Sequence, residues 1–90
     1  MVSRDGLQVS CRKALDSLQT IDPTQAAPLK REFQGLVTTA TQYGGVRDQV
    51  GETTRQTIDA MYQFRTLRLC AEINQSLMDS LVKQGATSVR

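Results

Sequence analysis

The side chains that most often carry catalysis are sparse in this chain of 90 residues. Histidine is absent, which removes the usual general base and the commonest metal ligand. The two cysteines, Cys11 and Cys70, therefore have no histidine to activate a thiol nucleophile, and they fall short of the ligand set of a typical zinc site. We predict no catalytic residue, no metal site and no cofactor.

The acidic residues are scattered along the chain rather than gathered in a motif. Glu72 and Asp79 are seven residues apart, so on a helix they would lie near one face and could act as paired carboxylates. Acids on exposed helix faces are common, so solvated surface charges are the favoured interpretation. Residues 44–47 (Gly-Gly-Val-Arg) are typical of a turn and lack the spacing of a phosphate-binding loop. We therefore predict that the protein is not an enzyme.

Three arginines, Arg55, Arg65 and Arg68, could contact an acidic partner or a nucleic-acid backbone. The net charge is only +2, from eleven basic and nine acidic residues, which argues against a dedicated nucleic-acid binder. Arginine stems that cover apolar surface while their heads stay in water are the favoured interpretation. A small helical nucleic-acid-binding regulator is kept as an alternative function.

The roles of the two cysteines stay open at this level. Both fall on apolar faces of the helices predicted below, where they could be small buried hydrophobes in a reducing compartment. A disulfide between the first and the third helix is the alternative.

The longest element that the sequence predicts is one amphipathic helix over residues 46–84. Apolar residues recur there every three or four positions, and the stretch contains no proline. Its second half carries a wide apolar arc, which needs two or more neighbours. This arc comprises Leu67, Leu69, Cys70, Ala71, Ile73, Leu77, Met78, Leu81 and Val82. Gly85 is expected to end the helix, with a frayed tail over residues 85–90.

Two shorter helices are predicted before it, over residues 5–20 and 27–43. The first has Ser3 or Asp5 as its cap and a heptad seam, Leu7, Cys11, Ala14, Leu18 and Ile21. Asp22-Pro23 would suit the start of a helix, but Pro28 one turn later would cost a hydrogen bond, so we expect residues 22–26 to be irregular. The second helix buries Leu29, Phe33, Leu36, Ala40 and Tyr43, and the Gly44-Gly45 pair ends it.

The predicted fold is all-α, a single domain over residues 1–90 in which two shorter helices pack as a hairpin against one long C-terminal helix. The long helix outreaches its neighbours, so part of it must overhang its own fold or meet something else. We predict a protein–protein interaction or assembly module whose partner is another protein or further copies of the chain. The expected interface is Leu67, Leu69, Ile73, Leu77, Met78, Leu81 and Val82.

The location is predicted from features that the sequence lacks. Met1 to Gly6 is polar and has no apolar core of a cleavable secretory signal. No apolar run approaches the length of roughly 18–20 residues that spans a bilayer. We predict a cytoplasmic protein without a membrane span, and keep export without a cleavable signal as an alternative.

Residues 73–89 (Ile-Asn-Gln-Ser-Leu-Met-Asp-Ser-Leu-Val-Lys-Gln-Gly-Ala-Thr-Ser-Val) resemble the C-terminal helix of type III secretion inner-rod and needle subunits. The Asp22-Pro23 break is loosely similar to the turn between the two helices of needle subunits. The resemblance covers about a fifth of the chain and implies a secretion-associated structural subunit or small chaperone whose C-terminal helix polymerises. The chain departs from the rod subunits, which carry further apolar residues at the C-terminus, and from the two-helix needle hairpin.

Overall fold

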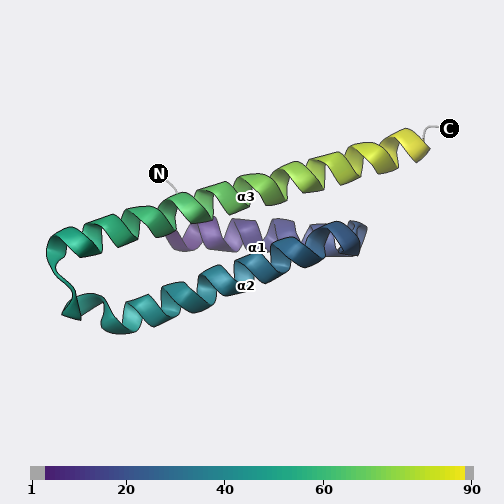
Figure 1. The fold of residues 1–90 in the computed structure, drawn as a ribbon. Coiled ribbons are helices and arrows are strands. Elements are labelled where there is room, and N and C mark those ends of the chain that lie inside the picture. The colour runs from purple at the N-terminus through teal and green to yellow at the C-terminus, as the bar shows by residue number, and fades with distance from the viewer. Residues whose placement is uncertain (1–3, 89–90) are drawn as a thin grey trace.

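The computed structural model describes residues 4–88, with side chains from Ser10 to Gly85. The chain forms helices α1 (Arg4–Ile21), α2 (Pro23–Val46) and α3 (Glu52–Ser88), with a short 3-10 helix, η1 (Arg47–Gln49), between the last two. Figure 1 shows α2 and α3 as an antiparallel hairpin, with α1 beside one half of it. The all-α prediction of two shorter helices against one long helix is confirmed.

The corner between α1 and α2 is a tight turn built on Asp22. The carboxylate of Asp22 accepts a hydrogen bond from the backbone N–H of Gln25 (3.3 Å), which caps the first turn of α2. Pro23 occupies the start of the helix, where its missing N–H would have had no helical partner. The predicted irregular segment at 22–26 is therefore wrong, and α2 accommodates Pro28 inside it. The cap offsets part of the cost of the hydrogen bond lost at Pro28.

The other corner also lies elsewhere than predicted. The helix continues through Gly44 and Gly45 to Val46, and neither glycine has a positive φ. The break comes at η1 and the extended residue Val50, so α3 begins at Glu52 rather than at Val46. A left-handed cap was expected at the glycines, but the backbone stays right-handed and helical through both of them. The side chain of Arg47, the residue after the helix, contacts Asp59 on α3.

The outer ends of the helices differ slightly from the predicted ones. The first helix begins at Arg4, so Asp5 lies inside it, whereas Ser3 lies outside the described residues. Gly85 does not end α3, which continues to Ser88 because a helical glycine costs only about 1 kcal/mol relative to alanine. Of the predicted frayed tail, only residues 89–90 lie outside the described residues.

The core sits where all three helices meet. Its buried residues come from each of them: Leu15 and Leu18 of α1, Ala26 of α2, and Leu69 and Ile73 of α3. Leu15 was absent from the predicted seam of the first helix, which gave that position to the smaller Ala14. Ala14, Leu29, Phe33, Leu36 and Leu77 pack around the core, partly buried.

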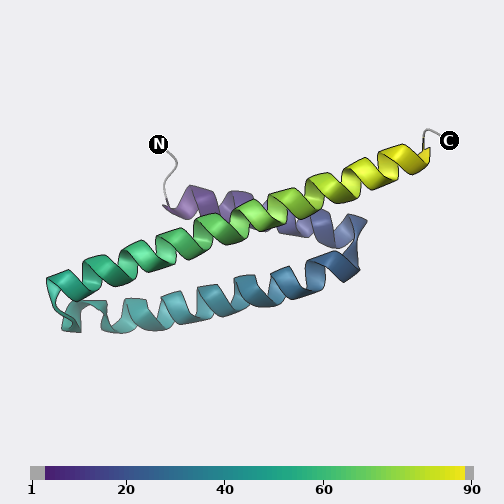
Figure 2. The ribbon, with the colours of Figure 1, turned by 45° about the horizontal axis from the view of Figure 1, so that its top comes forward.

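Helix α1 covers only part of the hairpin. Figure 2 shows α1 beside the middle of α3 and part of its C-terminal half, while in the described part of the chain only α2 and α3 form the end near η1. The helix α3 has 37 residues, about 55 Å at 1.5 Å per residue, and the molecule measures 59 × 25 × 16 Å. We call the end near η1 the hairpin end, and the end with α1 the three-helix end.

Candidate interaction surface

The face of α3 turned away from α1 and α2 carries a line of exposed, mostly apolar residues. The side chain of Phe64 is 64% exposed, that of Met78 60% and that of Leu67 50%. Their positions in the chain alternate by three and four residues, so they lie along one side of a helix. We name this line the outer row, and it comprises Phe64, Leu67, Ala71, Asn74, Met78 and Leu81.

The predicted interface residues separate onto two faces of α3. Leu69 and Ile73 are buried in the chain's own core, and Leu77 packs against that core. The chain's own helices cover most of these three side chains, so they offer less surface to a partner than the other four residues do. The other four, Leu67, Met78, Leu81 and Val82, are exposed. The sequence showed the width of the apolar arc, but periodicity alone could not tell which side of it faces the chain's own helices.

A groove runs beside the outer row, between α2 and α3. Its volume is about 640 Å³, and Gly35 and Leu36 of α2 and Leu69 of α3 contribute to its walls. Phe64, Met61 and Arg68 border the groove as well, so it is continuous with the outer row. The groove is open to solvent and mixes apolar and charged lining, which suits a macromolecular contact better than an enclosed small-molecule site.

The three candidate arginines do not line up. At about 100° per residue, Arg55 and Arg68 point about 140° apart around α3. Arg55 is half-buried, whereas Arg65 and Arg68 border the groove. The guanidinium of Arg68 pairs with Glu72 one turn on (3.3 Å). These arginines therefore form no continuous basic stripe.

A polar cluster at the hairpin end was not predicted from the sequence. Arg47 donates two hydrogen bonds to the carboxylate of Asp59, from Nε to Oδ1 (3.2 Å) and from a terminal nitrogen to Oδ2 (2.6 Å). The hydroxyl of Tyr43 donates to the same carboxylate (3.1 Å), and its ring stacks on Tyr62 with centroids 5.7 Å apart. Only the position of the chain reversal brings these residues together, and the sequence placed that reversal at residues 44–45 instead of 47–51.

The cluster shifts two pKa values. Burial, together with the hydrogen bond and the negative charge of Asp59, raises the pKa of Tyr43 above its ordinary value, and the nearby Arg47 offsets part of this. The hydrogen bond to Asp59 raises the pKa of Arg47. Tyr43 and Arg47 are therefore held in the protonated forms that donate hydrogen bonds to Asp59, which makes the cluster a clamp between α2 and α3.

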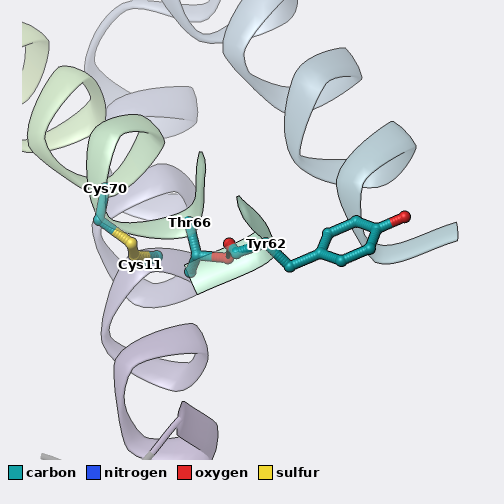
Figure 3. The surroundings of a disulfide bond; sticks show 4 residues. All are labelled: Cys11, Tyr62, Thr66 and Cys70. Carbon is teal, nitrogen blue, oxygen red and sulfur yellow. Dashed lines mark hydrogen bonds between the residues drawn. A yellow bond between two sulfur atoms is a disulfide. The ribbon is translucent and has the colours of Figure 1, made fainter. Parts of the chain in front are cut away.

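Cys11 and Cys70 form a disulfide that joins α1 to α3 (Figure 3). Their Cα atoms are 5.2 Å apart, within the range that disulfides span. One turn earlier on α3, the hydroxyl of Thr66 donates to the backbone oxygen of Tyr62 (2.8 Å). The ring of Tyr62 points away from the disulfide, toward α2. Of the two alternatives that the sequence left open for the cysteines, the structure therefore has the disulfide.

The described helices do not include one long and apolar enough to cross a membrane. The described residues also hold no group of three or more cysteine, aspartate or glutamate side chains placed to bind a metal ion.

Most of this chain matches a known protein family. No curated protein and no solved structure matches this chain. Residues 3–88 match the family described as YuaE, a description that carries no function. This match does not bear on the resemblance of residues 73–89 to type III secretion subunits, which stays a prediction. Because the match spans nearly the whole sequence, the chain belongs to the YuaE family.

Proposed function

We propose that this protein is a non-enzymatic helical assembly module that binds another protein chain through the outer row of α3. The observation that carries the proposal is that α3 has two apolar faces, one buried and one exposed. Ile73 on the inner face is completely buried, so the fold's own contacts are made there. The outer row is a second apolar face that the fold leaves uncovered.

An uncovered row of this kind favours a protein partner. Single exposed apolar residues are normal on a protein surface, but aligned ones mark interaction sites. Phe64, Leu67 and Met78 are each at least half exposed on one side of one helix. Burying such a side chain is worth roughly 1.5–3 kcal/mol, so a partner that covers three or four of them gains enough for stable binding.

The charges favour protein over nucleic acid. Phosphate contacts need several clustered cations, whereas Arg55, Arg65 and Arg68 point in different directions and Arg68 is paired with Glu72. The near balance of charge supports the same choice.

The disulfide supports an oxidising compartment for the working protein. Cytosolic thiols are kept reduced, so a bond between Cys11 and Cys70 is at odds with the predicted cytoplasmic location. Export without a cleavable signal, the alternative kept above, fits the bond better. Electrophoresis of protein taken from native cells under thiol-blocking, non-reducing conditions tests this: a free-thiol form would contradict an oxidising location.

The function is tested with aspartate variants on the two faces of α3. Leu67→Asp and Met78→Asp are each expected to weaken binding in affinity capture from the native cell by about tenfold to a hundredfold, because an apolar contact is lost. Their circular dichroism should match the native protein, since both positions are exposed. The matched control is Gln34→Asp on α2, which is also exposed and points away from α3.

A different outcome is expected for Leu77→Asp. Leu77 packs against the core, so this change should unfold the three-helix end rather than act on binding alone. If Leu67→Asp, Met78→Asp and Gln34→Asp all capture the same proteins as the native chain, the outer row is not the binding surface.

A further inference from the structure

We infer that the outer row takes a second copy of this chain, with the two α3 helices packed side by side and antiparallel. The inference rests on the proposed function and names the partner for that surface. It is carried by the register of the outer row and by the side chains that flank it.

The outer row has the spacing of a coiled-coil seam. Phe64, Ala71 and Met78 occupy the first position of successive heptads, and Leu67, Asn74 and Leu81 occupy the fourth. Ala60 and Gly85, both exposed, extend the row by one small residue at each end. This seam is separate from the inner one, so α3 can serve its own core and a second helix at the same time.

Antiparallel packing sets first-position residues of one copy opposite fourth-position residues of the other. In this register Phe64 faces Leu81 of the second copy, and Leu67 faces Met78. Ala71 faces Asn74 at the centre, where the small alanine leaves room for the amide. Two-fold symmetry then repeats each layer in reverse, as expected for a dimer in which both copies use the same patch. The polar Asn74 is the type of residue that fixes register at a cost in stability.

The flank beside the groove favours the antiparallel direction over the parallel one. In the antiparallel register the same flank of each copy meets itself, so exposed Met61 lies against Val82 of the second copy, which is 70% exposed. In a parallel pair, Met61 would instead lie opposite the polar Gln56, and Val82 opposite Leu77, which its own core already covers.

Charge on the same flank agrees with that direction. Arg65 and Arg68 lie toward the N-terminal half of the flank, and Glu72 and Asp79 toward the C-terminal half. The antiparallel register brings Arg68 next to Gln75 and Asp79 of the second copy. Within one copy Gln75 already donates a hydrogen bond to Asp79 (3.0 Å). This bond holds the carboxylate of Asp79 in the position that Arg68 of the second copy would contact. An antiparallel pair therefore sets opposite charges against each other at two symmetric places.

The first measurement is oligomeric state together with direction. Sedimentation equilibrium of the native chain, with its disulfide intact, should give a dimer at micromolar concentration. A nitroxide on a single new cysteine, Thr54→Cys, lies beyond the paired layers. Two such labels should be about 55 Å apart in the antiparallel dimer and closer than about 20 Å in a parallel one, as measured by double electron–electron resonance.

The second measurement uses paired variants. Leu67→Asp should raise the dimer dissociation constant at least about a hundredfold, because symmetry removes the contact twice. Arg68→Glu should weaken the dimer, and Arg68→Glu with Asp79→Lys should recover it, whereas Gln34→Asp should leave it unchanged. Recovery by the double variant is a result that a merely structural role of Arg68 would not give.

Each other outcome overturns a defined part. A monomer at all concentrations overturns the second copy, and if Leu67→Asp then still loses a captured protein, the proposed function survives with a different partner. A short label distance overturns the antiparallel direction. A dimer that resists Leu67→Asp but dissociates with Gly35→Asp places the contact in the groove instead of on the outer row.

Discussion

The two ends of this molecule are held together in different ways. At the three-helix end, Leu18 and Ile73 are completely buried, and a disulfide between Cys11 and Cys70 adds a covalent tie. Over residues 4–88, only α2 and α3 form the hairpin end, and the apolar residues there, such as Ile58, are at most half-buried. The clamp formed by Tyr43, Arg47 and Asp59 holds that end.

The difference follows from how many neighbours a helix has. With α2 and α3 packed together there, no apolar side chain in the described part of the hairpin end is fully enclosed, so burial gives less stability and directed polar contacts help to set the geometry. Three helices can enclose one, so most of the stability should come from the three-helix end. Changes at the two ends should therefore differ in size.

The largest effect is expected from breaking the disulfide. The bond closes a loop between residues 59 positions apart, for which the loss of chain entropy in the unfolded state predicts about 4 kcal/mol. Reduction, or Cys11→Ala with Cys70→Ala, should lower the unfolding free energy by about this amount in urea titrations followed by circular dichroism. The double variant should be insensitive to reductant. A native chain that unfolds at the same urea concentration with and without reductant would show that the disulfide contributes little to the unfolding free energy.

The next effect separates the apolar packing at the two ends. Ile73→Ala should cost about 3 kcal/mol, since it removes a fully buried side chain from a packed core. Ile58→Ala, the same change on the same helix at the hairpin end, should cost about 1 kcal/mol because its side chain is only half-buried. Equal losses would mean that the hairpin end is as well packed as the core.

A gain of stability is expected from the glycines near the hairpin end. Gly44 and Gly45 lie in α2 without a positive φ, and a methyl group on either would meet no atom within 4 Å. Gly44→Ala and Gly45→Ala should each raise the unfolding free energy by about 0.5–1 kcal/mol. A loss instead would indicate that one glycine adopts the left-handed cap that the sequence predicted there.

The end of α2, which was predicted wrongly, shows which features of the fold the sequence does not report. The all-α fold follows from the three- and four-residue recurrence of apolar positions, and that recurrence also identified the half-buried face of α2, from Leu29 to Tyr43. The glycine pair does not define the end of the helix, because it is compatible with a cap and with a helix interior. The contact of Arg47 with Asp59, twelve residues away, decided between them, and no local pattern reports such a contact.

The candidate interface was predictable in part for a similar reason. The arc from Leu67 to Val82 was correctly seen to be too wide for one neighbour. Dividing it into an inner and an outer face requires the position of α1, which the disulfide and Leu15 help to fix. The clamp was not predictable at all, because its residues come from both sides of a reversal that the sequence placed earlier.

The smallest effect is expected from titrating the clamp, and it concerns the hairpin end alone. The pKa of Tyr43 is raised above its ordinary value of 10.0, mainly by burial and then by Asp59. The neutral phenol is therefore favoured in the folded state. Its contribution to stability is fully present below pH 10 and is lost as the pH rises through the raised pKa.

Heating the native chain at pH values between about 9 and 11.5 should show a falling melting temperature. The Tyr43→Phe variant carries no hydroxyl at this position, so its melting temperature should fall less steeply over the same pH range. The titrations of lysine and of the other tyrosine are common to both proteins. Parallel curves would mean that the hydroxyl of Tyr43 contributes nothing to the clamp, and that Arg47 and Asp59 hold the hairpin end by themselves.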